Sequence, residues 1–249
     1  MPTFAYPGAP YGWRARIALL QPTMVSDTNP YEFYLMAPDG VQMVLTSLGI
    51  KGEGSRLDEY RRAIEQIDQP LKRVLARGVD AIIQTGVPPV VSRGWGFNEE
   101  LLARVAAITP VPFASDITCC IDGMKALGVG KVAVLAGASM LEGMEDYFSK
   151  AGLDLVGTST ERPHGLDDVS ADSLAVAFRG TVNLHRACPQ AEAIYIPGAN
   201  RPTVGMIAAA EEAIGIPVVT SAQACMWRGL QLAGVNTRTV AGYGRLFGV

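Results

Sequence analysis

The chain has 249 residues, of which 49% are hydrophobic and 18% are charged, and its formal net charge is −3. This composition excludes a disordered chain, which has few apolar residues, and a protein that binds polyanions through a basic excess. No apolar run approaches the roughly 20 residues that span a bilayer. We therefore expect neither a nucleic-acid partner nor a membrane partner.

In chain order, short apolar runs bounded by Gly or Pro predict strands, and apolar residues at helical spacing predict helices. The predicted elements are strand 16–20 (ended by Pro22), helix 57–77, strand 80–84, helix 97–108, strand 111–114, helix 117–127, strand 132–135, helix 140–151, strand 153–156, helix 170–187, strand 193–196, helix 203–214, strand 218–219 and helix 222–233. Alternating strands and helices with short loops are typical of parallel sheets with right-handed crossovers. The predicted fold class is therefore α/β.

The cysteine and histidine patterns limit the chemistry and the compartment. Four cysteines are too few for a disulfide scaffold, and the start of the chain shows no basic segment followed by an apolar one. The two histidines, without a CxxC or HExxH pattern, give no metal-ligand spacing. We expect a reduced, cytoplasmic protein with no metal and no cofactor.

An ordered series of internal matches predicts a duplication. Residues 80–86 align with 192–198, residues 16–20 with 131–135, Pro112 with Pro217, and Cys120 with Cys225. Chance similarity between strand–helix units is the alternative. The duplication predicts two pseudo-symmetric parallel-sheet lobes, with residues 1–118 plus 222–249 in lobe one and 119–221 in lobe two.

Ligands of such sheets bind beyond the carboxyl ends of the strands. Here those ends are the turns 86–89 and 198–201, and the duplication places them opposite each other. Either turn alone would also suit an ordinary strand-to-helix connection. Equivalent turns in both halves favour a site in the cleft between the lobes.

The duplication resembles the aspartate/glutamate racemase superfamily and, within it, the maleate isomerase and arylmalonate decarboxylase branch. Several stretches look like arylmalonate decarboxylases: Ser92-Arg93-Gly94 with Phe97-Asn98, Gly215-Ile216-Pro217-Val218-Val219-Thr220-Ser221, Trp227, Leu232-Ala233-Gly234 and Gly242-Tyr243-Gly244-Arg245-Leu246-Phe247. The resemblance implies a small carboxylic acid substrate and an enolate intermediate.

The departures from this family concern the two turns. Racemases and maleate isomerases in the family resemble one another in placing one cysteine in each turn, and arylmalonate decarboxylase keeps that of the second lobe. Gly86 and Gly198 stand at these positions here, so neither turn holds a thiolate. Val87 and Pro88 replace the hydroxyl residues that the resemblance implies, and Pro88 has no N–H group. We expect no amino-acid racemisation.

The remaining polar residues near the turns are the candidates for chemistry. His164 is the plausible imidazole acid or base, and Asn200 offers an amide in the second turn. Arg201 offers a guanidinium fork for a carboxylate, although a solvated helix start is the alternative, and Asn29 either binds a carboxylate or caps a turn. The predicted catalytic residues are thus His164 and Asn200, and the predicted substrate-binding residues are Asn29, Gly86, Val87, Pro88, Gly198, Ala199 and Arg201.

We therefore predict a cofactor-independent enzyme that acts on a small carboxylic acid through an enolate or enediolate. The favoured activity is that of an arylmalonate-decarboxylase-like lyase without the turn cysteines. A maleate cis-trans isomerase-like enzyme, a hydrolase that uses a bound water, and a non-catalytic carboxylate-binding protein are the alternatives. The sequence leaves open whether the protein forms a homo-oligomer.

Overall fold

A computed structural model describes residues 11–51, 56–137, 141, 143–160, 172–198 and 201–249. Within these residues two four-stranded sheets form, with the strand orders β2-β1-β3-β4 and β6-β5-β7-β8. All adjacent strands pair in parallel. The strands are β1 Ala15–Thr23, β2 Val41–Ile50, β3 Ala81–Gln84, β4 Phe113–Ser115, β5 Lys131–Leu135, β6 Asp154–Ser159, β7 Ala193–Ile196 and β8 Val218–Thr220.

Helices cover the sheets, and the middle strands β3 and β7 are buried along their whole length. Burial on both faces explains why these strands read as continuous apolar runs. The helices are α1 Thr28–Met36, α2 Arg56–Glu65, α3 Asp68–Leu75, α4 Pro88–Val91, α5 Phe97–Ala106, α6 Asp116–Ala126, α8 Met144–Lys150, α9 Asp172–Ala187, α10 Ile207–Ile214 and α11 Ser221–Leu232, with 3-10 turns η1 Val204–Met206, η2 Thr237–Thr239 and η3 Arg245–Gly248. No helix among the described residues is long and apolar enough to cross a membrane.

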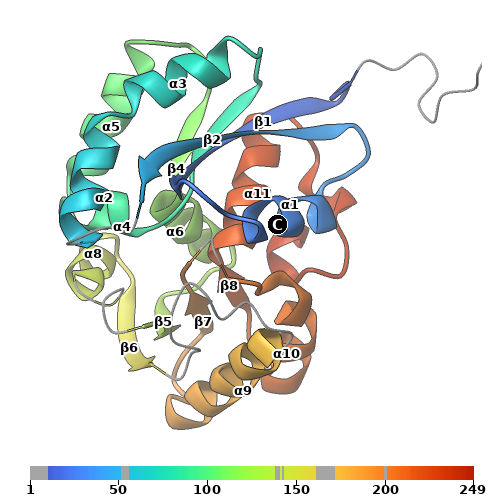
Figure 1. The fold of residues 1–249 in the computed structure, drawn as a ribbon. Coiled ribbons are helices and arrows are strands. Elements are labelled where there is room, and N and C mark those ends of the chain that lie inside the picture. Colours follow the sequence, from blue (N-terminus) through green and yellow to red (C-terminus); the bar gives the residue numbers. More distant parts are fainter. Residues whose placement is uncertain (1–10, 52–55, 138–140, 142, 161–171, 199–200) are drawn as a thin grey trace, which may run out of the picture.

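The two sheets repeat one topology, which confirms the predicted fold class of two parallel-sheet lobes. In Figure 1 the sheets form the upper and lower halves of the molecule, and helices α6 and α11 lie between them. These helices pack against each other; α6 also contacts β4 and β8, and α11 contacts strands of both sheets. The division of the chain after residues 118 and 221 stays a prediction.

The structure corrects several predicted elements. Strand β1 continues past Pro22 to Thr23, because a register shift against β2 between Gln21 and Thr23 accommodates a residue without an N–H group. The predicted helix 57–77 is two helices, α2 and α3. Pro70 explains this break, since its missing N–H and its ring interrupt a continuous helix just before it.

Three elements of the structure were not predicted: helix α1, strand β2 and the short helix α4. Helix α1 and the edge strand β2 occupy residues 28–50, where the apolar pattern has no clear period and β2 is only partly buried. The two prolines after Gly86 do not simply stop the chain but begin the short helix α4. Helix α8 begins at Met144, and the predicted start at Met140 lies outside the described residues.

Candidate functional site

The first turn follows β3 and is held from both sides. Gly86 has a φ of +87°, and a Cβ atom there would lie 2.6 Å from Cγ of Pro22, so both the backbone and the space require glycine. Its N–H donates to Oδ2 of Asp116 at 2.6 Å. The buried amide of Gln84 donates to the carbonyls of Thr85 at 2.5 Å and of Gly86 at 2.9 Å. The turn is thus fixed before any ligand arrives.

Helix α4 leaves this turn with few backbone donors. Val87 is its N-cap, and Pro88 and Pro89 occupy the first helical positions, where a helix otherwise offers free N–H groups. Because a trans peptide points its N–H away from its C=O, the bond from Gln84 to the Gly86 carbonyl directs the Val87 N–H away from Gln84. Val87 is buried. Of the predicted donors in this turn, the Val87 N–H is the one that remains.

The second turn follows β7. Gly198 has a φ of +116° and donates its N–H to Oγ of Ser221 at 3.1 Å. Arg201 is half-buried and has an interaction partner. The predicted residues Ala199, Asn200 and His164 lie outside the described residues, so their roles stay predictions.

A carboxylate from α1 reaches the helix start that follows the second turn. Oε1 of Glu32 accepts the N–H groups of Thr203, in a short bond, and of Val204 at 2.8 Å. Glu32 is buried, and this burial raises its pKa from 4.5 to about 7, against the lowering effect of the bonds from Thr203 and Val204. Sequence reasoning missed Glu32, because its partners lie more than 170 residues away. The sequence offered one signal: Glu32 lies three residues after Asn29, a spacing that places both residues on the same face of a helix.

Two side chains at the starts of the helices between the lobes each hold one turn. Asp116 and Ser221 are the first residues of α6 and α11, and their spacing of 105 positions repeats the offset of Cys120 and Cys225. Asp116 accepts the Gly86 N–H and Ser221 accepts the Gly198 N–H. Because α6 packs against α11, the two turns are bound to the starts of two neighbouring helices.

The environment of Asp116 is unusual for a carboxylate. The residue is fully buried, and this desolvation raises its pKa, while the neighbouring Ser221 hydroxyl and the hydrogen bond from the Gly86 N–H lower it. Cys120 donates its thiol to the other carboxylate oxygen at 3.3 Å, and the pKa of this thiol is raised by burial and by the Asp116 charge. Tyr195 is buried against the same group. Sequence reasoning did not single out Asp116.

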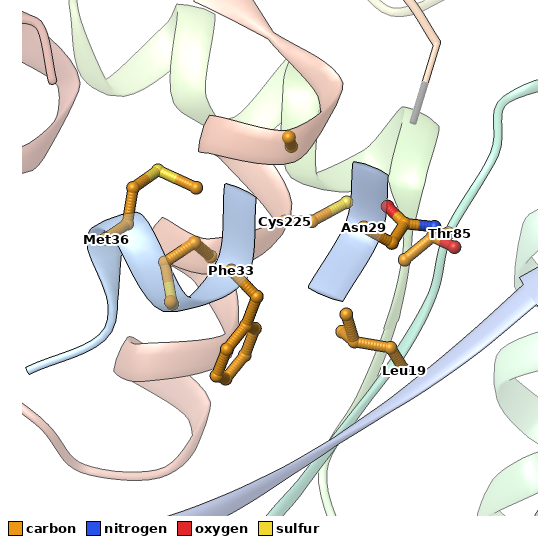
Figure 2. Close-up of a pocket in the computed structure, with 8 residues that line it drawn as sticks. Leu19, Asn29, Phe33, Met36, Thr85 and Cys225 are labelled. Carbon is orange, nitrogen blue, oxygen red and sulfur yellow. The ribbon is translucent and has the colours of Figure 1, made fainter. Parts of the chain in front are cut away.

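A narrow cavity lies between α1 and α11, beside the first turn. It measures about 20 Å³, which is room for one water molecule, and is lined by Leu19, Asn29, Phe33, Met36, Thr85, Ala222, Cys225 and Met226. Figure 2 shows Asn29 and Thr85 at one end and Met36 at the other. The Thr85 hydroxyl is buried and has no hydrogen-bond partner among the described residues. The cavity thus brings the predicted residue Asn29 next to the first turn, but it does not include Arg201.

The cysteines do not form a thiol site at the turns. All four are free and buried, and Cys225 is the one that lines the cavity. The neighbouring Cys119 and burial raise the pKa of the Cys225 thiol well above its ordinary value. Among the described residues, no group of three or more His, Cys, Asp or Glu side chains is placed to hold a metal ion.

Comparisons with known proteins identify the family. The family model of arylmalonate decarboxylase matches residues 18–247. This chain belongs to the arylmalonate decarboxylase family. Arylmalonate decarboxylase of Bordetella bronchiseptica is 27% identical over 199 residues, which are 79% of this chain and 83% of that protein. A maleate isomerase of Geobacillus stearothermophilus is 21% identical over 189 residues, 72% of this chain and 74% of that protein.

Solved structures show the same fold. Unliganded arylmalonate decarboxylase has a TM-score of 0.82 at 24% identity, covering 94% of this chain and 99% of that one. The maleate isomerase Iso of Pseudomonas putida S16 has a TM-score of 0.78 at 20% identity, covering 94% and 98%. The predicted branch and fold are therefore confirmed, whereas the predicted site residues stay predictions.

Proposed function

We propose that this arylmalonate decarboxylase family member is a cofactor-independent lyase that removes one carboxyl group from a small 2-substituted malonic acid without a cysteine in either turn. The observation that carries the proposal is the pair of glycine turns at the carboxyl ends of β3 and β7. Asp116 binds the N–H of one turn and Ser221 that of the other, in a chain whose family model is that of a decarboxylase.

The proposed reaction separates into two steps with different requirements. In the first, the bond between the α-carbon and one carboxylate breaks, CO₂ leaves, and the electron pair spreads onto the remaining carboxylate as an enediolate. This step needs a desolvated carboxylate and hydrogen-bond donors at the developing charge. The Val87 N–H, the second turn with Arg201, and Asn29 are the proposed donors.

The second step forms a C–H bond by proton transfer to the α-carbon. A thiol in a turn is one donor for such a step, and glycine at both positions leaves this chain to use another. We propose His164 or a water molecule for this role, with Asn200 orienting it. An imidazole suits proton transfer near neutral pH, because its ordinary pKa is about 6.5.

The test is an NMR assay of the purified protein with phenylmalonate, following loss of the substrate and formation of phenylacetate. We expect turnover, and we expect Cys225→Ala and the pseudo-symmetric control Cys120→Ala to retain it within about threefold, since neither thiol lies in a turn. Loss of turnover in Cys225→Ala alone would refute the thiol-independent step but leave the lyase standing. Absence of turnover by the native protein would refute the lyase.

A second candidate is a carboxylate-binding protein without turnover. It is favoured by one feature of the site: the protein's own side chains already engage the N–H groups of Gly86, Gly198, Thr203 and Val204. Malonate or phenylmalonate would then raise the melting temperature without being consumed. Maleate, followed in the same NMR assay for conversion to fumarate, tests the isomerase alternative.

A further inference from the structure

Strand β2 forms one edge of the first sheet and lacks the features that usually protect such an edge. It spans ten residues, Val41–Ile50, without a charged residue or a proline, and it pairs with β1 on one side (Figure 1). The other sheet edges are shorter: β4 and β8 have three residues each, and β6 has six, begins with Asp154 and contains a register shift. Long, uncharged edges favour pairing with a further strand. Among the described residues, β2 is therefore the edge that is best suited to a partner.

The backbone of every second residue in β2 faces away from β1. The N–H of Met43 donates to the hydroxyl of Tyr34 at 3.4 Å, a side chain outside the sheet, and the direction of these backbone groups alternates along a strand. Leu45 and Ser47 therefore also direct their N–H and C=O groups outward. The register shift against β1 follows Ser47, so the regular edge ends there. Leu45, in the middle of this edge, has a side chain that is 37% exposed.

We propose that β2 pairs antiparallel with β2 of a second copy of this chain, with Leu45 of the two copies facing each other on a twofold axis. In an antiparallel pair, opposite residues with outward groups exchange two hydrogen bonds, so the edge is complementary to itself. This register pairs Leu45 with Leu45 and Met43 with Ser47. A register centred one residue earlier would require the N–H of Val41, which already donates to the Pro38 carbonyl at 3.0 Å.

The charges at the two ends of β2 match this arrangement. Asp39 precedes the strand and Lys51 follows it, both are exposed, and neither forms an ion pair within the part of the chain that the structure describes. Antiparallel pairing brings Lys51 of one copy beside Asp39 of the other, twice in the dimer. Arg14, at the same end as Asp39, lies over the ring of Trp13, 4.9 Å from its centroid. A parallel pair would instead bring like charges together.

Exposed apolar side chains gather in the same part of the chain. Among the described residues, nine of the eleven large hydrophobic side chains that are exposed lie between Tyr11 and Leu57. Trp13 and Tyr34 are half-exposed aromatic residues of this group: the ring of Trp13 lies against Gly40, just before β2, and Tyr34 bonds Met43. Aromatic residues are enriched in protein interfaces. A second copy would cover this surface, and its strand would replace the long bond from Met43 to Tyr34.

The first test is sedimentation of the purified protein over a wide range of concentrations. We expect a dimer of twice the 26.4 kDa chain mass. Leu45→Lys should raise the Kd of the dimer by about 100-fold or more, because it places two like charges opposite each other at the axis. Thr158→Lys is the matched control. Thr158 is exposed on β6 and pairs with Val134 of β5 as Leu45 pairs with Leu19 of β1, and this variant should remain dimeric.

The second test is cross-linking, which reports the register. Leu45→Cys should form a covalent dimer with diamide as the oxidant, because opposite Cα atoms of a hydrogen-bonded pair lie about 5.5 Å apart, within the range of a disulfide. Thr46→Cys should not, since the two copies of this residue would not lie opposite each other. The native cysteines are buried. Asp39→Lys and Lys51→Asp should each weaken the dimer by about fivefold, and the double variant should restore it.

Three results would overturn the proposal. A native protein that stays monomeric would show that the edge is protected by its own side chains, Tyr34 foremost. A dimer that persists in Leu45→Lys would place the interface elsewhere, and equal cross-linking of Leu45→Cys and Thr46→Cys would exclude the proposed axis. If Leu45→Lys does not fold, the two cysteine variants decide. None of these measurements uses turnover, so they are independent of the proposed function.

Discussion

The turn after β3 and the turn after β7 hold equivalent places in two sheets of the same topology, yet they are stabilised differently. The first turn is held by residues close to its own sheet: Asp116 after β4 accepts its N–H, Gln84 of β3 binds its carbonyls, and two prolines follow. The second turn depends on other parts of the chain, because Glu32 of the first sheet's half binds the helix start beyond it. We therefore expect the first turn to keep its geometry without help from the other lobe. The geometry after the second turn, in contrast, should depend on the contact with Glu32 of the other lobe.

The largest expected effect comes from returning a thiol to the first turn. Gly86→Cys should lower the free energy of unfolding by about 4 kcal/mol, since a left-handed φ strains a side chain and the new Cβ would overlap Pro22. Chemical denaturation measures the loss. Gly94→Cys is the control, because it has a similar φ of +84° but nothing within 4 Å of its Cβ. Equal losses in the two variants would show that the space at Pro22 is not limiting.

The contact of Glu32 with the second turn should make stability depend on pH. Its pKa is raised from 4.5 to about 7 in the folded protein, so the folded state holds a proton that the unfolded chain has released between these values. The stabilisation is therefore complete below pH 4.5 and is lost as the pH rises through 7. We expect Glu32→Gln to gain about 2–3 kcal/mol relative to the native protein between pH 5 and pH 8.

The measurement is urea unfolding of both proteins at each pH. Glu145→Gln, at an exposed residue of α8, controls for the loss of one acidic group. A native-to-Gln difference that stays constant from pH 5 to pH 8 would mean that Glu32 keeps its charge in the folded state and that the bonds from Thr203 and Val204 outweigh its burial.

The sequence predicted what depends on local pattern and missed what depends on distant partners. Seven strands and the duplication follow from apolar runs and turn residues, and the structure confirms them. The roles of Asp116 and Glu32 arise from hydrogen bonds to residues 30 and more than 170 positions away, which no local period encodes. The equal offset of 105 that aligns Cys120 with Cys225 also aligns Asp116 with Ser221, and this signal could have identified the two residues that bind the turn glycines.

A thiol in the second turn should behave differently from one in the first. Gly198→Cys should cost about 1–2 kcal/mol, from its φ of +116°. The new thiol would stand at a half-buried position and should react with iodoacetamide faster than the four native cysteines, which are buried. Alkylation kinetics and a melting curve test both points. A stable variant with an unreactive thiol would show that Gly198 does not face the site.

The smallest expected effect concerns how the two helices between the lobes begin. Thr220 caps α11 with a capping box: its hydroxyl accepts the Gln223 N–H and the Gln223 side chain accepts the Thr220 N–H, each at 3.3 Å. The equivalent Ser115 caps no backbone N–H of α6, and its hydroxyl instead bonds the side chains of Asn98 and Thr118. Thr220→Ala should therefore lower the free energy of unfolding by about 1 kcal/mol, while Thr220→Ser, which keeps the hydroxyl, should lose only a few tenths. Because α11 begins with Ser221, the loss of this cap should also loosen the Gly198 amide slightly in hydrogen exchange. Equal stability of the Ala and Ser variants would show that packing alone fixes the start of α11, and that the second turn does not depend on its cap.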